Sequence, residues 1–383
     1  MKVQLVDPSA NTPAYDHALA GALARAGGDV ELVTSRYMYG PVPDAKGYRV
    51  TDAFYSRSSR FYGDEYLRTR PTGPKARVRL ALKLAEHVAG MLRYRSQAEA
   101  AEIVHYQWLM LEQLDARLLA PKRPRVFTSH NAVPREPRRG QLAATQRLLE
   151  RMDAIVVHSE HGAGRIGETF GIPVERLHVI PHGTFDHLTR LPDEQPLPDE
   201  LAAVEGPVAL FFGTLRPYKG VEVLLEAFEQ LDAGELWVVG LPHLPLEPLR
   251  ELAARAPGTV RFVPRFITDP EIPAYFRRAD VVVLPYREID QSGVLYTALA
   301  FGKAVVATSV GGFTEAAERD GVARLVPPED PGALAEAVDE LLGNEGERAL
   351  LEEAARKAAA GPYSWDAIGR QTMALYERLR QDC

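Results

Sequence analysis

The sequence contains a single cysteine, Cys383, at its last position. Without a second thiol, the chain can form neither an intrachain disulfide nor a cysteine-based metal cluster. A chain without structural disulfides is typical of a reducing compartment. We therefore expect a cytoplasmic protein.

Long hydrophobic runs are missing as well. The apolar run before Asp7 is far shorter than the hydrophobic region of a signal peptide. The stretch 80–92 is interrupted by Lys83, Glu86 and His87, so no window approaches the roughly 20 apolar residues that cross a bilayer. Any contact with a membrane is therefore expected to be peripheral.

The chain also lacks an excess of positive charge, because 45 Lys and Arg stand against 52 Asp and Glu, for a net charge of −7. Proteins dedicated to nucleic acids usually have a basic balance, so nucleic acid is not an expected partner. With 46% hydrophobic and 25% charged residues, the composition is that of a globular protein. At 383 residues, the chain is long enough for two domains, each with its own core.

Several sequence motifs are absent. The chain has no nucleophile elbow GxSxG and no paired-histidine zinc motif HExxH, which argues against a hydrolase triad and against a metal site. It also shows no internal repeat with a period of roughly 20–50 residues. We expect no metal and no resident cofactor.

Short apolar runs alternate with longer amphipathic ones, which predicts βαβ units and parallel sheets. We expect strands in the first half at 3–6, 30–34, 103–106, 126–129, 154–158 and 177–180, and in the second half at 208–212, 236–239, 260–263, 281–284 and 304–307. Helices are expected at 15–26, 221–231, 294–301 and 331–342. The predicted fold class is therefore α/β, with two doubly wound parallel-sheet domains.

The domain boundary is expected within residues 188–206, which are rich in proline and acidic residues and show no sustained period. This places one domain at 1–187, a linker at 188–206 and a second domain at 207–362. After a Gly-Pro pair, residues 363–383 have the pattern of an amphipathic helix.

One region breaks this rhythm. Residues 49–95 contain eleven Lys or Arg against four Asp or Glu, with six aromatic residues among them. Two interpretations stay open, a solvated irregular insertion and a surface for anionic lipid or a phosphate-bearing acceptor. Single-stranded nucleic acid would also suit basic and aromatic side chains, but the rest of the chain does not support it.

The turn after the run 208–212 carries two cations. Gly213 ends the strand, and Arg216 and Lys219 lie in the turn, with a helix expected to begin near Lys219. In open parallel sheets, ligands bind beyond the C-terminal ends of the strands. Cations are unfavourable at the positive end of a helix unless an anion lies between them. The pair suits a diphosphate; the alternative is two solvated loop residues.

A second stretch of this kind follows the run 281–284. Ser292 and Gly293 stand at the start of the helix 294–301, where a hydroxyl and backbone N–H groups can bind phosphate oxygens. Neither stretch contains GxGxxG or GxxxxGK[ST], so neither a dinucleotide fingerprint nor a P-loop accounts for them.

Four of the ten histidines lie at strand ends in the first half, within HYQW (105–108), SHN (129–131), HSE (158–160) and HG (182–183). A single histidine there is more often a packing residue that bonds to nearby backbone. Four of them together favour a polar cleft.

Three stretches of the second half, FFGTLRPYKGVEVLLEAF, LPYREIDQSGVLYTALAFGKAVVAT and VGGFTEAAE, resemble the C-terminal domain of the retaining glycosyltransferases of the GT-B fold, sequence family 4. In the first half RVFTSHNAVPRE, AIVVHSEHGAGRIGETFGI and LHVIPHG resemble the same family more loosely. The resemblance covers most of the chain outside 49–95 and 188–206.

This resemblance implies two Rossmann-like domains facing across a cleft, with the helix 363–383 crossing back to the first. It implies transfer of a sugar from a nucleotide-diphosphate donor to a hydroxyl acceptor such as a glycan, a glycolipid or a small-molecule glycoside. The anomeric configuration would be retained by displacement on the same face, without a metal and without an enzyme nucleophile.

The resemblance also assigns residues to roles. Lys219 would stabilise the leaving diphosphate, while Asp290 and His130 would contact the transferred sugar. Arg216 lies three residues before Lys219, and from its reach we expect it to substitute for the arginine that the family has five residues before the lysine. Donor binding is expected from Gly213, Thr214, Ser292, Gly293, Val294, Thr297, Arg265, Phe266, His182 and Gly183. On the acceptor side we expect Tyr15, Asp16, Gln107, Trp108 and Asn131.

The chain departs from the family pattern at three places. Thr214 stands where an arginine is common, and Thr297 stands where a glutamate usually binds ribose hydroxyls. The glycine-rich turn expected after the first strand is replaced by DPSANTPAYD. Two alternatives therefore remain: a nucleotide-sugar epimerase or hydrolase, with Asp7, Asp16 and Glu160 as candidate acids and bases, and a nucleotide-sugar-binding protein without catalysis.

Overall fold

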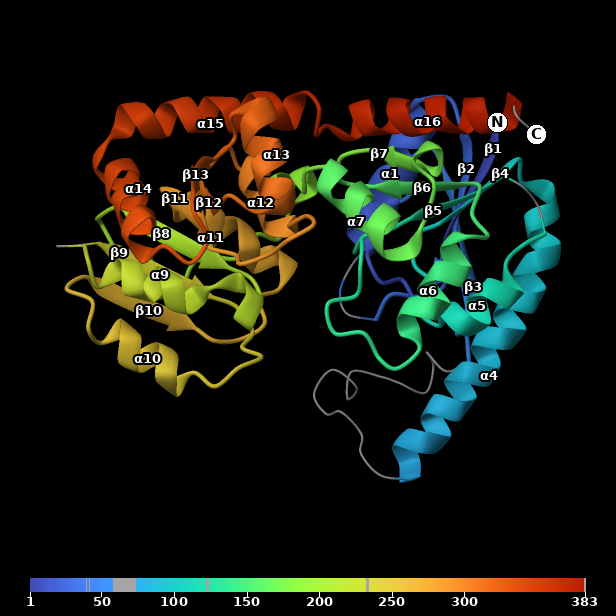
Figure 1. The fold of residues 1–383 in the computed structure, drawn as a ribbon, viewed down its shortest axis with the longest axis horizontal. Coiled ribbons are helices and arrows are strands. Elements are labelled where there is room, and N and C mark those ends of the chain that lie inside the picture. The colour runs from blue at the N-terminus through green and yellow to red at the C-terminus, as the bar shows by residue number, and fades with distance from the viewer. Residues whose placement is uncertain (39, 41, 58–73, 122–123, 232–233, 382–383) are drawn as a thin grey trace. The chain divides into compact units, whose positions relative to one another are not determined.

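The computed structural model describes all residues except 39, 41, 58–73, 122–123, 232–233 and 382–383. The chain divides into two compact units (Figure 1). The first unit comprises Met1–Pro181 and Trp365–Cys383, and the second comprises His182–Ser364. Each has its own parallel sheet and its own buried core.

The sheet of the first unit has seven parallel strands in the order β3-β2-β1-β4-β5-β6-β7. Its register is set at the centre, where Val3 lies between Val30 and Ile103. All three of these side chains are buried, as expected for a sheet covered on both faces. The strands are β1 (Lys2–Asp7), β2 (Asp29–Ser35), β3 (Arg49–Phe54), β4 (Ile103–Tyr106), β5 (Arg125–Thr128), β6 (Ala154–Val157) and β7 (Leu177–Val179).

Eight helices belong to the described part of this unit. The α-helices are α1 (Pro13–Arg25), α4 (Pro74–Gln97), α5 (Glu112–Leu118), α6 (Gln141–Leu149), α7 (Glu160–Phe170) and α16 (Trp365–Gln381), and the short 3-10 helices are η1 (Ala98–Ala100) and η2 (Val174–Arg176). In α7, the stretch GAGRIG at 162–167 has the spacing GxGxxG, but all three glycines lie inside the helix. The helix begins at Glu160 under a cap in which the Ser159 hydroxyl accepts a hydrogen bond from the Gly162 N–H. The pattern therefore forms no phosphate-binding loop here.

The C-terminal helix α16 is part of the first unit, although it follows the second unit in sequence. It packs against α1, where Arg25 forms an ion pair of 2.7 Å with Asp366. Deeper in the unit, the hydroxyl of Tyr376 lies 2.5 Å from Nδ1 of His105 on β4. The aromatic face of α16 is thus tied directly to a central strand.

The second unit has six parallel strands in the order β10-β9-β8-β11-β12-β13. They are β8 (Val208–Phe212), β9 (Glu235–Val239), β10 (Thr259–Val263), β11 (Val281–Leu284), β12 (Ala304–Thr308) and β13 (Arg324–Val326). The strand order reverses between β8 and β11, and in such sheets ligands bind beyond the C-terminal ends of the strands at this reversal.

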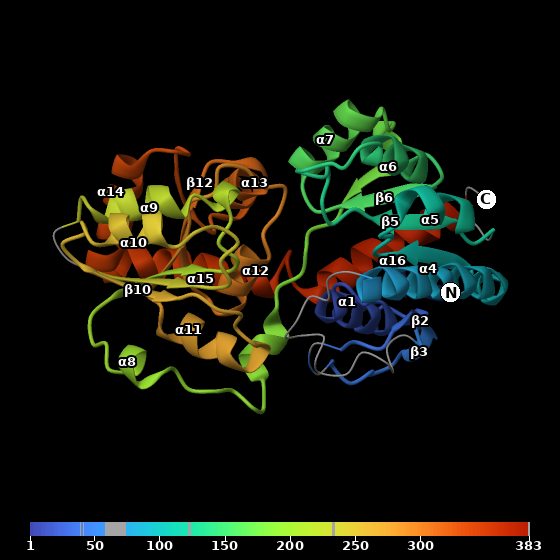
Figure 2. The same cartoon turned by 90° about the horizontal axis from the view of Figure 1, so that it is seen from below.

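Helices cover both faces of this second sheet, with α9, α10 and α14 on one face and α11 on the other (Figure 2). The helices are α8 (Asp199–Ala202), α9 (Val221–Phe228), α10 (Glu247–Ala253), α11 (Ile272–Arg278), α12 (Gly293–Ala300), α13 (Gly311–Asp320), α14 (Pro331–Gly343) and α15 (Glu345–Ala360). Their apolar faces and the strands bury one continuous core around Trp237.

The predicted fold class is confirmed, and two strands are added to the predicted set. β3 was hidden in the basic region because it is an exposed edge strand with only Phe54 fully buried. β13 has three residues, too few to form a pattern. The region 49–95 also contains the long helix α4, so the described part of it is regular rather than irregular.

Candidate functional site

The turn after β8 brings Lys219 back toward the end of the strand. Gly213 has φ +110°, and a Cβ placed on it would lie 2.8 Å from Nζ of Lys219 and 3.4 Å from Cγ2 of Val294. Because Gly213 has no side chain, the lysine amine can occupy this space beside the first turn of α12. Three residues predicted for the donor site are therefore neighbours.

A second close approach fixes the same turn against β11. The turn continues as the 3-10 helix η4 (Pro217–Lys219), which ends at Gly220 with φ +62°. A Cβ on Gly220 would lie 2.1 Å from the carbonyl oxygen of Pro285, just beyond β11. Only glycine permits this contact. Because Gly220 is in the left-handed conformation, it interrupts the helical backbone, and α9 starts after it at Val221 rather than near Lys219.

Lys219 has an aromatic neighbour but no anionic one. Its amine lies over the ring of Tyr286, 5.0 Å from the centroid, and the residue is only 6% exposed. In the part of the chain that the structure describes, the amine has no carboxylate within ion-pair distance. A buried ammonium without a counter-ion is costly, so this position is suited to an anionic ligand.

The first turn of α12 is the second element of the site. Its N-cap, Ser292, is 4% exposed, and its hydroxyl makes no capping hydrogen bond to the helix. The N–H groups of the first turn are therefore not satisfied by their cap. Gly293 lies under Phe185, whose ring would be 3.3 Å from a Cβ at this position. Asp290, just before the cap, is 7% exposed.

An aromatic stack supports this helix mouth. The ring of His182 stacks on Tyr296 at 4.9 Å between centroids, and Phe185 lies 5.2 Å from His182. Nδ1 of His182 is 2.6 Å from the carbonyl oxygen of Gly183. His182 and Gly183 thus contribute to the second unit. Phe185, Tyr286 and Tyr296 were missed in the sequence, although Tyr286 directly follows the proline that ends the apolar run.

Thr297 cannot replace a glutamate at its position. Its hydroxyl donates a hydrogen bond of 2.9 Å to the carbonyl oxygen of Gly293, one turn earlier in α12. This bond uses the only donor of the side chain. The threonine can still accept one hydrogen bond, but it provides no charge for a ribose.

The remaining residues predicted for the donor site are at least partly exposed to solvent. Arg216 is exposed, and Thr214 is half-buried. Arg265 forms an ion pair of 2.6 Å with Glu271, and Phe266 is 63% exposed. The structure thus groups Gly213, Lys219 and Val294 with the α12 mouth, while Arg265 is engaged in its own turn after β10.

In the first unit, three aromatic rings contact His130. Trp108 stacks on its ring at 4.9 Å between centroids, and Tyr15 meets it edge-on at 4.7 Å. Nδ1 of His130 lies 3.4 Å from Nε2 of His158. Tyr15 also packs on Trp365 of α16. The predicted acceptor-side residues Tyr15 and Trp108 are therefore brought to the predicted catalytic histidine.

A pair of buried carboxyl groups takes the place of the glycine-rich turn. Asp7 accepts hydrogen bonds from the N–H groups of Ser9 and Asn11, at 3.0 and 2.5 Å. The carboxyl group of Asp16 is close enough to influence that of Asp7. Burial, and then the charge of Asp7, raise the pKa of Asp16 well above its usual value. Asp16 is therefore the carboxyl group of the pair that holds a proton more readily.

Residues 15–184 match the family model described as Glycosyltransferase Family 4, and residues 206–344 match the one described as Glycosyl transferases group 1. The chain belongs to glycosyltransferase family 4. The D-inositol 3-phosphate glycosyltransferase of Xylanimonas cellulosilytica is 28% identical to it over 94% of this chain and 90% of that protein. The predicted enzyme class is confirmed, and neither alternative is favoured.

Solved structures confirm the GT-B fold of this glycosyltransferase. Sucrose-phosphate synthase from Thermosynechococcus elongatus superposes with a TM-score of 0.75 at 22% identity, covering 100% of both chains. The Anabaena protein HepE in complex with UDP-glucose has a TM-score of 0.70 at 19% identity, covering 99% of this chain and 100% of the other.

Two further predicted residues of the glycosyltransferase differ in environment. Gln107 is fully buried, and neither atom of its amide has a hydrogen-bond partner among the described residues. Asn131 is exposed, and its backbone carbonyl oxygen accepts a hydrogen bond from the Ser129 hydroxyl. By contrast, His105 is held between Tyr376 and Thr128. This histidine has a packing role, which was the simpler of the two interpretations.

The described ranges of the glycosyltransferase contain no group of three or more His, Cys, Asp or Glu that could hold a metal ion. No helix among them is long and apolar enough to cross a membrane.

Proposed function

We propose that this glycosyltransferase moves a sugar from a nucleotide-diphosphate donor to a hydroxyl acceptor, with retention at the anomeric carbon. The observation that carries the proposal is Lys219, a buried cation without an anionic partner among the described residues, placed beside the uncapped first turn of α12. A diphosphate would supply the missing charge to both.

The names of related proteins support this donor class. A relative is called a D-inositol 3-phosphate glycosyltransferase, and the structural neighbour HepE was solved with UDP-glucose. Three features of the second unit would suit such a donor, namely the buried cation Lys219, the uncapped N-terminus of α12 and the buried carboxylate of Asp290, which would face the sugar.

The proposed chemistry is displacement on one face of the sugar. The acceptor oxygen bonds to the anomeric carbon on the face from which the bond to the phosphate oxygen breaks. The acceptor proton passes to the departing phosphate oxygen. Lys219 and the α12 N–H groups stabilise the negative charge that develops there. Because these groups provide the positive charge, the proposed reaction needs neither a metal nor a resident cofactor.

Three residues complete the proposed roles. Arg216, on the same turn as Lys219, would approach the diphosphate from solvent, and Asp290 would accept hydrogen bonds from sugar hydroxyls. His130 would contact the transferred sugar from the first unit. Its packing between Trp108 and Tyr15 would hold its ring in one orientation.

The test is incubation of the purified protein with UDP-, GDP- and ADP-sugars, with and without a panel of hydroxyl acceptors. We expect nucleotide release that depends on the acceptor and persists in EDTA, and a product with the anomeric configuration of the donor by NMR. Release without acceptor together with an epimerised sugar would point to the epimerase instead. Binding of nucleotide-sugar without release under any condition would point to a binding protein.

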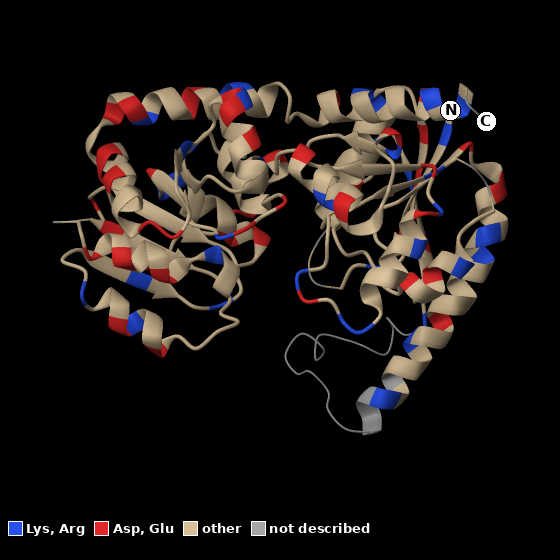
Figure 3. Ribbon diagram, in the orientation of Figure 1, with Lys and Arg blue, Asp and Glu red and all other residues tan. Residues whose placement is uncertain are grey.

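We further propose that the enzyme is cytoplasmic and contacts anionic membrane peripherally through α4. In the first half of this helix, the described residues are exposed on every side, including Val78 (62%), Leu80 (70%) and Leu82 (61%). Lys and Arg are interspersed along the same helix (Figure 3). Apolar and basic side chains together on one exposed helix suit an anionic lipid surface.

Vesicle co-sedimentation tests this contact. We expect binding to vesicles with anionic lipid, weaker binding at high salt because charge is screened, and loss of binding in the double variant Leu80→Ser/Leu82→Ser. Leu350, which is 67% exposed in the second unit, provides the matched control Leu350→Ser. Equal binding by the α4 variant and by the wild type would refute the proposed surface.

A further inference from the structure

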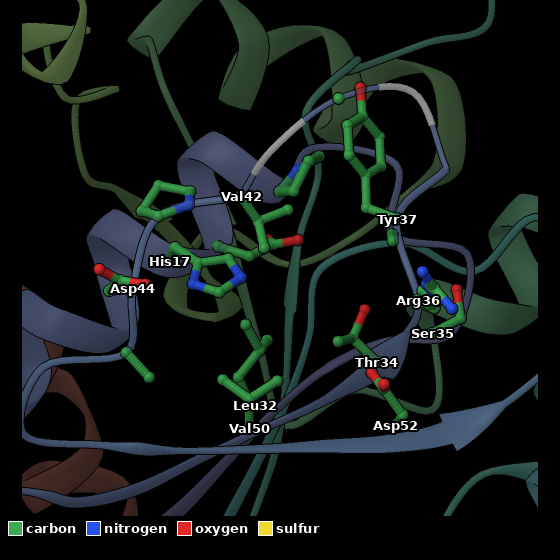
Figure 4. Close-up of a pocket in the computed structure, with 16 residues that line it drawn as sticks. His17, Leu32, Thr34, Ser35, Arg36, Tyr37, Val42, Asp44, Val50 and Asp52 are labelled. Carbon is green, nitrogen blue, oxygen red and sulfur yellow. The ribbon is translucent and has the colours of Figure 1, made fainter. Parts of the chain in front are cut away.

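The first unit contains a pocket of about 470 Å³ beside α1, next to the C-terminal ends of β1 and β2. In Figure 4, His17 and Asp44 lie on one side, and Thr34, Ser35 and Arg36 lie on the other. The pocket differs from the aromatic cluster around His130, but it adjoins that cluster in sequence, because Asp16 lines the pocket and Tyr15 packs on His130.

Asp16 gives the wall of this pocket an unsatisfied acceptor. The residue is 1% exposed. Its Oδ1 atom is buried and has no hydrogen-bond partner within the described chain, while the carboxyl group is otherwise engaged with Asp7. Since buried polar atoms are nearly always paired, this oxygen would accept a hydrogen bond from a ligand hydroxyl that reached it from the pocket.

The other polar groups of the wall are largely neutral. The Thr34 hydroxyl donates a hydrogen bond of 2.8 Å to the carbonyl oxygen of Asp7. Nδ1 of His17 lies 2.7 Å from the hydroxyl of Tyr48, so this nitrogen is also engaged. Burial lowers the pKa of His17, which keeps its ring uncharged. Apart from Arg36, the wall therefore offers dipoles rather than cations.

The charges at its rim are mainly negative. Among the lining residues that the structure describes, Asp44 and Asp52 are exposed carboxylates, and Arg36 is the one Lys or Arg. A phosphate monoester would add about two more negative charges to this surrounding, whereas sugar hydroxyls can donate to the carboxyl oxygens without such repulsion.

We propose that this pocket binds the acceptor, and that the group bound in it is an uncharged polyol or sugar rather than a phosphate monoester. The proposal rests on the proposed glycosyl transfer and names its acceptor class. It separates this chain from the relative whose name specifies an inositol 3-phosphate acceptor.

The first test measures binding without any donor. Saturation-transfer NMR and calorimetry would compare myo-inositol and D-glucose with D-inositol 3-phosphate and glucose 6-phosphate on the full-length protein. We expect an uncharged member to bind, and its phosphate monoester to bind at least about tenfold more weakly, a difference of about 1.4 kcal/mol. Failure of both uncharged probes to bind, or equal or tighter binding of a phosphate monoester, would overturn the proposal.

A second test reverses the charge of the rim. In the double variant Asp44→Lys/Asp52→Lys, the affinity for the phosphate monoester relative to that for the uncharged probe should rise by about tenfold or more, because two repulsive charges become attractive. The control Glu99→Lys/Glu168→Lys makes the same change in net charge at two exposed positions of the first unit outside the pocket. An equal shift in both double variants would show a long-range charge effect only and would overturn the proposed pocket.

The two proposals fail in different ways. If the uncharged probes bind more tightly than their phosphate monoesters but the protein releases no nucleotide from any donor, the proposed function is contradicted. If the protein turns over its donor normally but shows no such preference, only the proposed pocket is contradicted.

Discussion

The amine of Lys219 lies over the ring of Tyr286, with 5.0 Å between the nitrogen and the ring centroid. The two residues come from the ends of neighbouring strands, β8 and β11, at the point where the strand order of the second sheet reverses. The ring holds the amine at the sheet edge by a cation–π contact and leaves its N–H groups for a ligand. This placement makes Lys219 the residue whose loss should matter most.

Lys219→Ala is expected to lower turnover by roughly 10²–10³-fold, because it removes a buried, fixed positive charge from beside the departing phosphate. The fold should be retained, since the amine forms no ion pair among the described residues whose loss would leave a buried carboxylate alone. Steady-state rates of nucleotide release, with circular dichroism as the check on folding, measure both effects.

A matched control is Lys357→Ala, at an exposed position on α15 of the same unit. This variant should turn over like the wild type. Unchanged activity in Lys219→Ala would show that the lysine takes no part in the reaction.

Gly213→Ala should impair the same step by a different route. The added methyl group would lie 2.8 Å from the lysine amine, and φ +110° is strained for any residue with a Cβ. We expect the amine to be displaced, turnover to fall by at least about tenfold, and the free energy of unfolding to fall by about 1–3 kcal/mol. Urea unfolding and nucleotide-release rates provide the measurements.

Gly164→Ala is the comparison for that variant. Gly164 lies inside α7, and a Cβ there would have no atom within 4 Å. This substitution should raise the free energy of unfolding by up to about 1 kcal/mol through helix propensity, without affecting turnover. If both variants behave alike, the close approach at Gly213 is not what constrains the site.

Much of the fold could be predicted from the sequence because its strands are buried on both faces and read as short apolar runs. The run 208–212 is strand β8 residue for residue, as 281–284 is β11. β3 could not be found in this way, since an exposed edge strand in a basic segment carries no apolar run. The pattern of apolar runs therefore identifies the central strands but does not identify an exposed edge strand.

The site was predictable where one short segment carries it. The turn with Gly213 and Lys219 and the mouth of α12 are each local in sequence, and both lie at strand ends. The contact of Gly220 with the Pro285 carbonyl could not be predicted, because it depends on the backbone of a strand 65 residues away in sequence. The raised pKa of Asp16 likewise depends on burial, which the sequence does not show.

Thr297→Val tests whether the threonine that stands in place of the usual glutamate contributes to nucleotide binding. Because the hydroxyl of Thr297 donates to the Gly293 carbonyl, its loss should leave nucleotide affinity within about twofold and cost stability by about 0.5–1.5 kcal/mol, as for one hydrogen bond. Calorimetric titration with the nucleotide diphosphate gives the affinity. A tenfold loss of affinity would instead mean that the hydroxyl contacts the ligand.

The final prediction concerns acid stability of the first unit. Burial, and then the nearby His158, lower the pKa of His105 from its usual 6.5 to about 3, so the folded state keeps this ring neutral. Below pH 6.5 the unfolded chain binds a proton that the folded chain does not, so the free energy of unfolding falls as the pH falls. The slope from this residue is about 1.4 kcal/mol per pH unit, down to the folded pKa near 3.

His105→Gln removes that titration while leaving an amide that can bond to Tyr376 or Thr128. We expect the variant to be less stable at pH 7 but to lose stability less steeply between pH 6 and 4. Groups that titrate in both proteins, such as Asp7 and Asp16, cancel from the difference in slope. Hydrogen exchange of peptides from β4 and α16, compared with peptides from β8, measures this unit separately. Parallel pH profiles in the two proteins would rule out His105 as a source of the acid sensitivity.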